Sequence, residues 1–420
     1  MVQIIPLRKY LKTFAGAAAG EYLSKAFGFI TTMYLARILT AEDFGALGFS
    51  SALASYAVLI ANFGLDQYAA QSISSGRTEN AKQITRDIFI IRSILSVLTF
   101  IPCILFGMYS SYSVQYQWLF ILQAFVISAY ALNPQFYYTA VDRLRVFSIQ
   151  RITVAGLSFA AVFLVIRDRN DIAFIPMLTG SITFVVFLLA ALSIYRKEKN
   201  EIAALKSIKM LSILKGALPL GISSLMIQIY YSADMIFLGI MQPGTDTGLY
   251  AAAYRVILIF TAVPGLFYMV FLPHLSTITE EYFRNIHTRT YILLQIFTGC
   301  ILTVVLYIWS EEVIALILGA TFLPAVKVFR ILDINLFLVF VNVAVGNLLI
   351  AWNRQKEYLI VVSAGAFVNI LLNVALIPEM GIYGAAYATV GAEIGVLLFT
   401  IYYHLREIRK SVMKVKQREI

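Results

Sequence analysis

Apolar runs of about 20 residues recur from one end of this 420-residue chain to the other, with only short polar stretches between them. Each run is long enough to cross about 30 Å of hydrocarbon as a helix. Only 13% of the residues are charged, against about 25% in soluble proteins. A membrane β-barrel would show short segments of alternating polarity, and the sequence has none. These features predict an all-α polytopic membrane protein.

We predict about twelve transmembrane helices, arranged as two six-helix bundles around a central cavity. The predicted spans cover residues 13–37, 44–66, 87–109, 116–138, 147–166, 172–195, 213–240, 248–272, 289–309, 331–351, 358–377 and 382–404. The longest predicted cytoplasmic connection follows the sixth span and is basic. The predicted domains are an N-terminal bundle at 1–195, a linker at 196–212, a C-terminal bundle at 213–404 and a basic tail at 405–420.

Two short motifs recur and support a duplication. Asp43-Phe-Gly45 leads the second predicted span, and Asp246-Thr-Gly248 leads the eighth. Ala140-Val-Asp142-Arg143 follows the fourth span, and Ala351-Trp-Asn353-Arg354 follows the tenth. Because each half has an even number of spans, the halves would share one orientation, as in transporters built from parallel repeats.

The basic residues separate by predicted side of the membrane. With the N-terminus inside, 25 Lys and Arg residues fall in inside segments, 5 in outside loops and 3 within spans. This asymmetry predicts that both termini are cytoplasmic. It also accounts for the net charge of +10 without a nucleic-acid partner. Two cysteines in apolar runs imply no disulfide framework.

Lys25 and Glu21 are charges well inside the first predicted span. A charge at the centre of a span costs roughly 2.5–3.5 kcal/mol on insertion scales, so it usually faces a partner or a cavity. The two residues lie one helical turn apart on the same face. They either neutralise each other, or Lys25 faces the cavity and binds an anion while Glu21 tunes it.

Four more charges lie within predicted spans. Arg255 and Arg92 either line the cavity as anion-binding residues, like Lys25, or snorkel to the nearer interface. Asp234 either pairs with Arg255 or binds a coupling cation. Glu393 either carries H⁺ or Na⁺ or lies in a helix contact beside Gly391 and Gly395.

Signals of a soluble enzyme are absent from the sequence. It has no phosphate-binding loop, its three histidines lack metal-ligand spacing, and no catalytic residue can be nominated. We therefore expect a protein that is not an enzyme and that has no metal and no cofactor.

Several ordered stretches resemble a known family. In the first half they are Leu35-Ala-Arg37-Ile-Leu-Thr-Ala-Glu-Asp43-Phe-Gly45 and Asn62-Phe-Gly64-Leu65. In the second half they are Pro219-Leu-Gly-Ile-Ser-Ser, Asp234-Met-Ile-Phe-Leu-Gly239, Gly248-Leu-Tyr250-Ala-Ala-Ala-Tyr254-Arg255, Asn369-Ile-Leu-Leu-Asn373-Val-Ala-Leu-Ile-Pro378 and Gly381-Ile-Tyr-Gly384-Ala-Ala. Over nearly its whole length the chain resembles the polysaccharide biosynthesis transporters. These are Wzx-type flippases of lipid-linked oligosaccharides, in the superfamily that includes the multidrug and toxin extrusion (MATE) exporters.

The resemblance implies a multi-pass protein of the bacterial cytoplasmic (inner) membrane. Such relatives move undecaprenyl-diphosphate-linked oligosaccharides to the outer leaflet for O-antigen or capsule synthesis, through a cationic cavity and by ion-coupled alternating access. Other membrane proteins of polysaccharide assembly would be partners. Asp234 and Arg255 fall on the family's patterned stretches, whereas the role of Lys25 rests on its depth alone.

Two other functions within the superfamily are weighed. A MATE-type, cation-coupled multidrug exporter would use Glu21, Asp234 and Glu393, while Lys25 and Arg255 weigh against it. Flippases of peptidoglycan precursors typically have fourteen spans, and the twelve predicted here disfavour that substrate.

Overall fold

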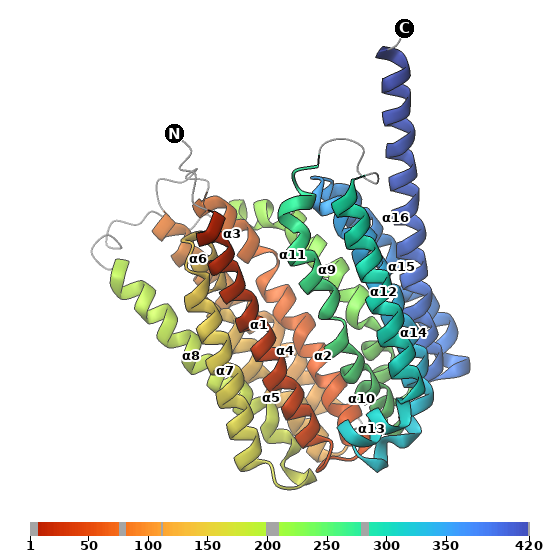
Figure 1. The fold of residues 1–420 in the computed structure, drawn as a ribbon. Helices are drawn as coiled ribbons and strands as arrows, with labels where there is room; N and C mark the ends of the chain where they lie inside the picture. The colour runs from red at the N-terminus through yellow and green to blue at the C-terminus, as the bar shows by residue number, and fades with distance from the viewer. Residues whose placement is uncertain (1–6, 75–80, 111, 199–209, 279–284, 419–420) are drawn as a thin grey trace. The chain divides into compact units, whose positions relative to one another are not determined.

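The computed structural model describes residues 7–74, 81–110, 112–198, 210–278 and 285–418 (Figure 1). Within these residues all regular structure is helical. The chain divides into two compact units, unit 1 at Met1–Leu225 and unit 2 at Met226–Ile420. The predicted all-α class is confirmed.

Unit 1 is a bundle in which α1 packs along α7, and α5 packs against both α4 and α8. Short α3 lies against α4 and α6. Its elements are α1 (Leu7–Leu35), α2 (Ala41–Asn62), α3 (Leu65–Ser74), α4 (Ala81–Tyr109), α5 (Val114–Ala131), α6 (Gln135–Ala140), α7 (Leu144–Val165), η1 (Arg169–Ala173), α8 (Phe174–Glu198) and the first part of α9 (Met210–Met241). The predicted fourth span is thus two helices, because Pro134 follows the end of α5 and has no N–H to continue it.

Unit 2 is built around α14, which packs against α10, α11, α12, α15 and α16. Its elements after α9 are α10 (Thr245–Phe260), α11 (Val263–Leu275), α12 (Ile286–Ile308), α13 (Ser310–Ile317), η3 (Ala320–Ala325), α14 (Val326–Ala351), α15 (Gln355–Met380) and α16 (Ile382–Arg418). The predicted eighth span is also divided, into α10 and α11, with Pro264 in the first turn of the second helix. Side chains of α14 are buried on several faces of the helix, as its central position requires.

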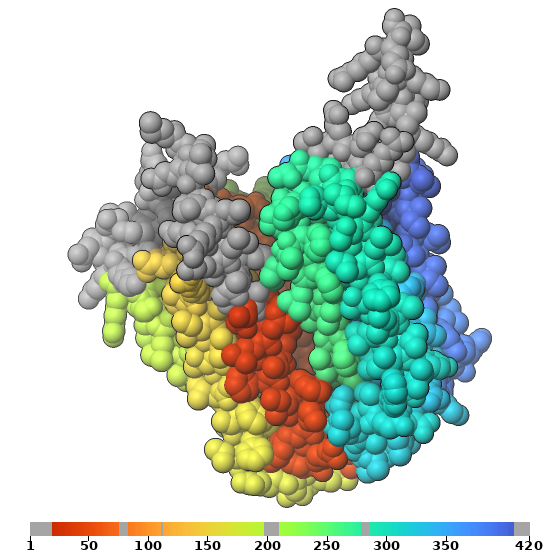
Figure 2. Space-filling model, in the orientation of Figure 1, coloured from red at the N-terminus to blue at the C-terminus, as the bar shows by residue number. Residues whose placement is uncertain are grey.

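Eleven helical segments in the described part of the chain are long and apolar enough to span a membrane. Helix α1 is not among these eleven, but it is 29 residues long and carries Glu21 and Lys25. Counting α1, the number of membrane-length helical segments in the described residues agrees with the predicted twelve. Exposed apolar side chains mark the surface that faces lipid. On α12, which covers much of one face of unit 2 in Figure 2, Leu293, Phe297, Ile301 and Val304 are between 48% and 66% exposed. Such a stripe would be unfavourable in water, and the chain is a multi-pass membrane protein.

One of the two repeated motifs encodes the same turn twice. Asp142 and Asn353 both have left-handed backbone, with φ of 54° and 64°. The next residue donates its backbone N–H back to the preceding helix in each case, from Arg143 to Tyr138 O (2.8 Å) and from Arg354 to Leu349 O (2.7 Å). Asp and Asn tolerate this conformation better than other non-glycine residues. The duplication therefore extends to backbone geometry.

The other motif has diverged. Asp43 is fully buried at the third position of α2 and closes a capping box with Thr40, which satisfies backbone N–H groups that the helix start leaves open. Asp246 is exposed in the first turn of α10, and the buried residue there is Thr247, whose hydroxyl donates to Gln242 O at 2.5 Å. Both copies of the motif lie at the start of a helix, but the side chains that cap α2 and α10 differ.

The predicted linker and tail differ from what the structure describes. Residues 199–209 of the linker lie outside the described residues, and the boundary between the units falls within α9. The first part of α9 belongs to unit 1 because Ile213 and Ala217 pack with Leu65 and Phe136 in one buried cluster. Close backbone approach adds to this, since a Cβ at Gly64 (φ +74°) would lie 2.4 Å from the Gly221 nitrogen. At the other end, α16 continues to Arg418 through most of the predicted tail.

Candidate functional site

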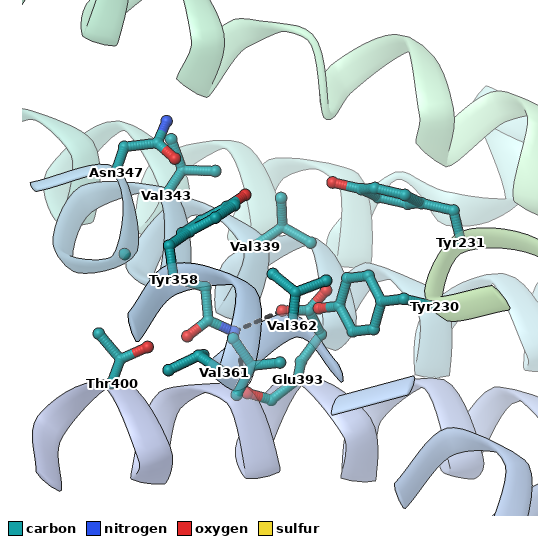
Figure 3. Close-up of a pocket in the computed structure, with 13 residues that line it drawn as sticks. Tyr230, Tyr231, Val339, Val343, Asn347, Tyr358, Val361, Val362, Glu393 and Thr400 are labelled. Carbon is teal, nitrogen blue, oxygen red and sulfur yellow. Dashed lines mark hydrogen bonds between the residues drawn. The ribbon is translucent and has the colours of Figure 1, made fainter. Parts of the chain in front are cut away.

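Unit 2 contains a pocket around Glu393, hereafter the Glu393 pocket, between α9, α14, α15 and α16 (Figure 3). Three tyrosines line it, Tyr230, Tyr231 and Tyr358, and valines from α14, α15 and α16 fill most of the remaining wall. Helical spacing explains the lining. Glu393 and Thr400 lie two turns apart on one face of α16, and Asn342 faces them from α14.

Glu393 is buried, with 5% of its surface exposed. The Asn342 side-chain amide donates to the Glu393 carbonyl at 2.9 Å and also to its carboxylate. The Tyr230 hydroxyl lies against the same carboxylate (Figure 3). Both neighbours are hydrogen-bond donors, so both favour a carboxylate acceptor. No basic side chain forms an ion pair with Glu393 in the described residues.

Two buried oxygens in this pocket have no hydrogen-bond partner among the described residues. They are Oδ1 of Asn342 and Oγ1 of Thr400. Buried polar atoms are usually satisfied, so such exceptions require an explanation. Glu393 was identified from the sequence, but Thr400 was missed. Its seven-residue spacing from Glu393 was the available signal.

Asp234 lies deep in unit 2, with 3% of its surface exposed. Its carboxylate accepts from the Tyr250 hydroxyl, from the Thr389 hydroxyl at 3.4 Å and from the Met235 backbone N–H at 2.9 Å. It forms no ion pair with Arg255 in the described part of the chain. Arg255 itself is half-buried on α10. The structure therefore supplies Asp234 with neutral donors in place of the predicted arginine partner.

Asp333 is a third buried acid in unit 2. Its side chain is fully buried on α14, and neither carboxylate oxygen has a hydrogen-bond partner among the described residues. The short elements η3 and α13 also pack against α14.

Arg92 in unit 1 is buried, with 2% of its surface exposed, and does not snorkel. It pairs with Asp66 at 3.3 Å and donates to the carbonyls of Asn133 (2.8 Å) and Tyr130 (3.1 Å). These carbonyls lie where α5 ends before Pro134, and the Tyr130 carbonyl also accepts from the Asn133 backbone N–H at 3.2 Å. Arg92 thus connects α4 to the break in the fourth predicted span. Its guanidinium is engaged by Asp66 and these two carbonyls and is not directed at a ligand.

Lys25 and Glu21 form an ion pair on α1, with 3.0 Å between Nζ and Oε1. A second cation approaches the same acid, since Arg151 Nη1 on α7 lies 3.8 Å from Glu21 Oε2. All three side chains are partly exposed, at 52% for Lys25, 44% for Glu21 and 38% for Arg151. Arg151 lies near the start of the predicted span 147–166. The contact between α1 and α7 brings it to the pair and leaves the cluster with a net positive charge.

Both the sequence and the fold resemble known proteins. A family model described as "Polysaccharide biosynthesis protein" matches residues 11–279. The chain belongs to this family. The match spans residues 11–225 of unit 1 and, in unit 2, the rest of α9 with α10 and α11, so the resemblance seen in the sequence motifs is confirmed.

The proteins that this chain resembles are named as transporters or as a flippase. It is 21% identical to the "Putative O-antigen transporter" of Escherichia coli K12 over 386 residues, covering 87% of this chain and 89% of that one. Its fold is similar to "Lipid II flippase MurJ, inward closed conformation", with a TM-score of 0.74, 16% identity and coverage of 92% and 87% of the two chains. An inward-facing MATE multidrug transporter gives a TM-score of 0.65 at 12% identity, with coverage of 91% and 94%. The predicted MATE-like architecture is thereby confirmed.

Proposed function

We propose that this protein is a flippase that moves undecaprenyl-diphosphate-linked oligosaccharide repeat units from the inner to the outer leaflet of the bacterial cytoplasmic membrane. The product would feed surface polysaccharide synthesis, as O-antigen or capsule, in concert with other membrane proteins of that assembly. Membership in the polysaccharide biosynthesis protein family is the observation that carries the proposal. The relative named as an O-antigen transporter, matched along most of both chains, supports the substrate class.

The partly exposed cations of the protein suit such a substrate. A diphosphate bearing a polar oligosaccharide is costly to desolvate, and charge-assisted hydrogen bonds from fixed cations offset that cost. In our proposal Lys25 and Arg255 meet the diphosphate. Glu21 contacts both Lys25 and Arg151. Arg92 is left out of this role because Asp66 and two carbonyls engage it.

Transport would proceed by alternating access and draw on an ion gradient, with both termini in the cytoplasm. Lipid-linked substrates are large, so the lipid tail would stay in the bilayer while the diphosphate and sugars pass through the protein. The gradient of H⁺ or Na⁺ would make the movement directional. The buried acids of unit 2, which lack basic partners in the described residues, are the groups suited to respond to it.

A MATE-type cation-coupled multidrug exporter is the second candidate. The observation in its favour is the set of buried acids in unit 2, Asp234, Asp333 and Glu393, which form no ion pair in the described residues. A cationic drug would be attracted to such acids. The net positive cluster of Lys25, Glu21 and Arg151 disfavours this candidate.

The purified protein in liposomes distinguishes the two candidates. A lipid-diphosphate oligosaccharide is placed in one leaflet and its appearance in the other is followed, with a fluorescent cationic drug in parallel. Protein-dependent movement of the lipid without the drug would support the flippase, and the reverse result would support the exporter.

Variants locate the anion site in the same assay. Lys25→Ala and Arg255→Ala should slow flipping, whereas Lys327→Ala, which removes an exposed cation of α14, should not. Wild-type rates in both cavity variants, with normal insertion, would remove these residues from the proposed site.

A further inference from the structure

Three polar side chains at the edge of the Glu393 pocket are not used by the fold. They are Tyr231 on α9, Asn347 on α14 and Tyr358 on α15, hereafter the tyrosine rim. Neither the two hydroxyls nor the Asn347 amide forms a hydrogen bond within the described residues. Polar groups on membrane-spanning helices are costly when they face lipid, so they usually face a partner, water or a substrate. The tyrosine rim is therefore a surface at which a ligand can bind.

The Tyr231 ring is half-exposed and held in position. It is 51% exposed. Its backbone carbonyl accepts from the Tyr254 hydroxyl at 3.0 Å, and its ring packs edge-to-face on Tyr230 with 5.1 Å between the ring centroids. In the view of Figure 3 the rings of Tyr231 and Tyr358 lie on either side of the pocket, and their hydroxyls point toward each other. A ring that is already ordered loses little conformational entropy when a ligand packs against it.

Gly346, next to Asn347 on α14, keeps space open beside the rim. It lines the Glu393 pocket, and a Cβ built on it would meet no atom within 4 Å. Glycine inside a helix is less favourable than alanine, so packing does not explain this residue. Gly299 on α12 is different, because a Cβ there would lie 2.7 Å from Phe340. The glycine at 346 is thus accounted for by the space that it leaves and not by a close contact.

The interior of the pocket offers one oriented acceptor. Asn342 Nδ2 lies 2.9 Å from the Glu393 carbonyl oxygen, which can only accept a hydrogen bond. The amide therefore presents its NH₂ group to Glu393, and its Oδ1 is directed elsewhere. That oxygen is buried and has no partner in the described part of the chain. It is an acceptor available to a hydroxyl group of a ligand.

The chemistry of the rim and the interior favours a neutral ligand that carries hydroxyl groups. Hydroxyls and amides both donate and accept hydrogen bonds, and tyrosine adds an apolar ring face. Among the described residues that line the pocket none is basic and one is acidic, which disfavours a phosphate group. A sugar matches these groups, because its hydroxyls donate and accept and its C–H face packs on an aromatic ring.

The size of the pocket determines how a sugar can be placed. The enclosed volume is about 50 Å³, which holds a few water molecules and not a whole sugar ring. A sugar ring must therefore lie on the tyrosine rim, with a single hydroxyl or other substituent inside the pocket.

We propose that the tyrosine rim is the sugar-binding subsite of unit 2. One sugar of the lipid-linked oligosaccharide lies with its C–H face on the Tyr231 ring, hydrogen-bonds Asn347 and Tyr358, and directs one hydroxyl to Asn342 Oδ1. The inference rests on the proposed function, since it takes its substrate from it. It assigns recognition of the sugar to residues other than the cations that meet the diphosphate.

Binding to the purified full-length protein tests the subsite. Two undecaprenyl diphosphates are compared, one bearing the oligosaccharide and one without sugar, by displacement of a fluorescent copy of the oligosaccharide lipid. The wild type should bind the oligosaccharide lipid more tightly. Tyr231→Ala should raise the Kd of that lipid about three- to tenfold, as expected for one lost aromatic contact, and leave the Kd of the sugar-free lipid unchanged.

Three further variants separate the contributions to binding. Gly346→Leu fills the space beside the rim without removing a polar group, and it should have the same selective effect as Tyr231→Ala. Tyr231→Phe retains the ring and should give a smaller rise in Kd. Tyr387→Ala is the matched control, because Tyr387 is 45% exposed on α16 and lies outside the pocket lining. It should leave both Kd values unchanged.

Two results would overturn the subsite. One is equal affinity of the wild type for the two lipids, or an equal rise of both Kd values in Tyr231→Ala. The other is loss of binding of a fluorescent cationic drug in Tyr231→Ala with both lipids unaffected, which would make the rim a drug site.

Flipping of the same lipids in liposomes separates this inference from the proposed function. If the oligosaccharide lipid is moved by the wild type and Tyr231→Ala keeps the wild-type preference between the lipids, the subsite is wrong and the flippase stands. If the oligosaccharide lipid binds through Tyr231 but is not moved, the proposed function is wrong and the subsite stands.

Discussion

In unit 1 the three aspartates on α2, α3 and α4 each lie within 4 Å of an arginine, whereas in unit 2 the three buried acids have only neutral partners or none among the described residues. The unit 1 pairs are Asp43 with Arg169 (3.5 Å), Asp66 with Arg92 (3.3 Å) and Asp87 with Arg86 (2.7 Å). The unit 2 acids are Asp234, Asp333 and Glu393. Both units are bundles of membrane-length helices, so the contrast is one of charge compensation and not of fold class.

This contrast suggests a division of labour. Acids that are paired with arginine already have their charge compensated, and a change in H⁺ or Na⁺ concentration has little to act on. Acids without a cation need one from solution, so their state follows the ion gradient. We therefore expect mutations of paired acids in unit 1 to reduce stability and mutations of unpaired acids in unit 2 to alter the response to cations.

The largest effect is expected at Arg92. Arg92→Met should lower the free energy of unfolding by about 3–5 kcal/mol, because it leaves Asp66 as an uncompensated charge and removes the side-chain donor to the Asn133 carbonyl. Reversible unfolding in detergent measures the loss. Arg145→Met removes an exposed cation of the same unit and serves as control. Equal stability of the two variants would show that the buried pair does not support unit 1.

The second prediction sets one acid from each unit against the other. Asp66→Asn should lower stability by about 2 kcal/mol, because Arg92 loses its counter-charge. Asp333→Asn should raise stability by about 1 kcal/mol above neutral pH, because it removes a buried charge that has no partner in the described residues. Parallel unfolding curves at pH 8 give both values. Changes of the same sign would remove the contrast between the units.

The third prediction compares the two copies of the Asp-x-Gly motif. Asp43→Asn should cost about 1–2 kcal/mol, because the carboxylate accepts from the Thr40 backbone (2.9 Å) and the Tyr116 hydroxyl (2.8 Å). Asp246→Asn changes an exposed residue and should alter stability by less than about 0.5 kcal/mol. Similar losses at both positions would mean that the divergence of the caps has no energetic consequence.

The smallest effect on stability is expected at the left-handed turn that both units contain, at Asp142 and Asn353. Asp142→Ala and Asn353→Ala should each lower stability by about 1 kcal/mol, because alanine pays a steric cost in left-handed backbone that Asp and Asn reduce. Replacing either residue with glycine should be neutral or slightly stabilising. The same unfolding assay applies. A clear inequality between the two alanine variants would argue against equivalent turns.

Local sequence patterns predicted the features whose causes are local. The apolar runs predicted helical spans because hydrophobic length is a property of one segment, and the repeated Ala-x-Asx-Arg motif indicated a duplication that the turns at Asp142 and Asn353 reproduce. The polysaccharide transporter resemblance came from ordered motifs along the chain, and the family match agrees with it. The breaks before Pro134 and Pro264 fall at residues that were visible but were included within single predicted spans.

The partners of the buried charges depend on contacts between helices far apart in the sequence. Arg92 meets carbonyls 38 and 41 residues away, Asn342 meets Glu393 across 51 residues, and Arg151 reaches Glu21 from α7. A charge within an apolar run therefore indicates that a partner is needed but does not identify it. Membrane insertion and helix length follow from the hydrophobicity of each segment, whereas the compensation of each buried charge is decided only when the helices pack.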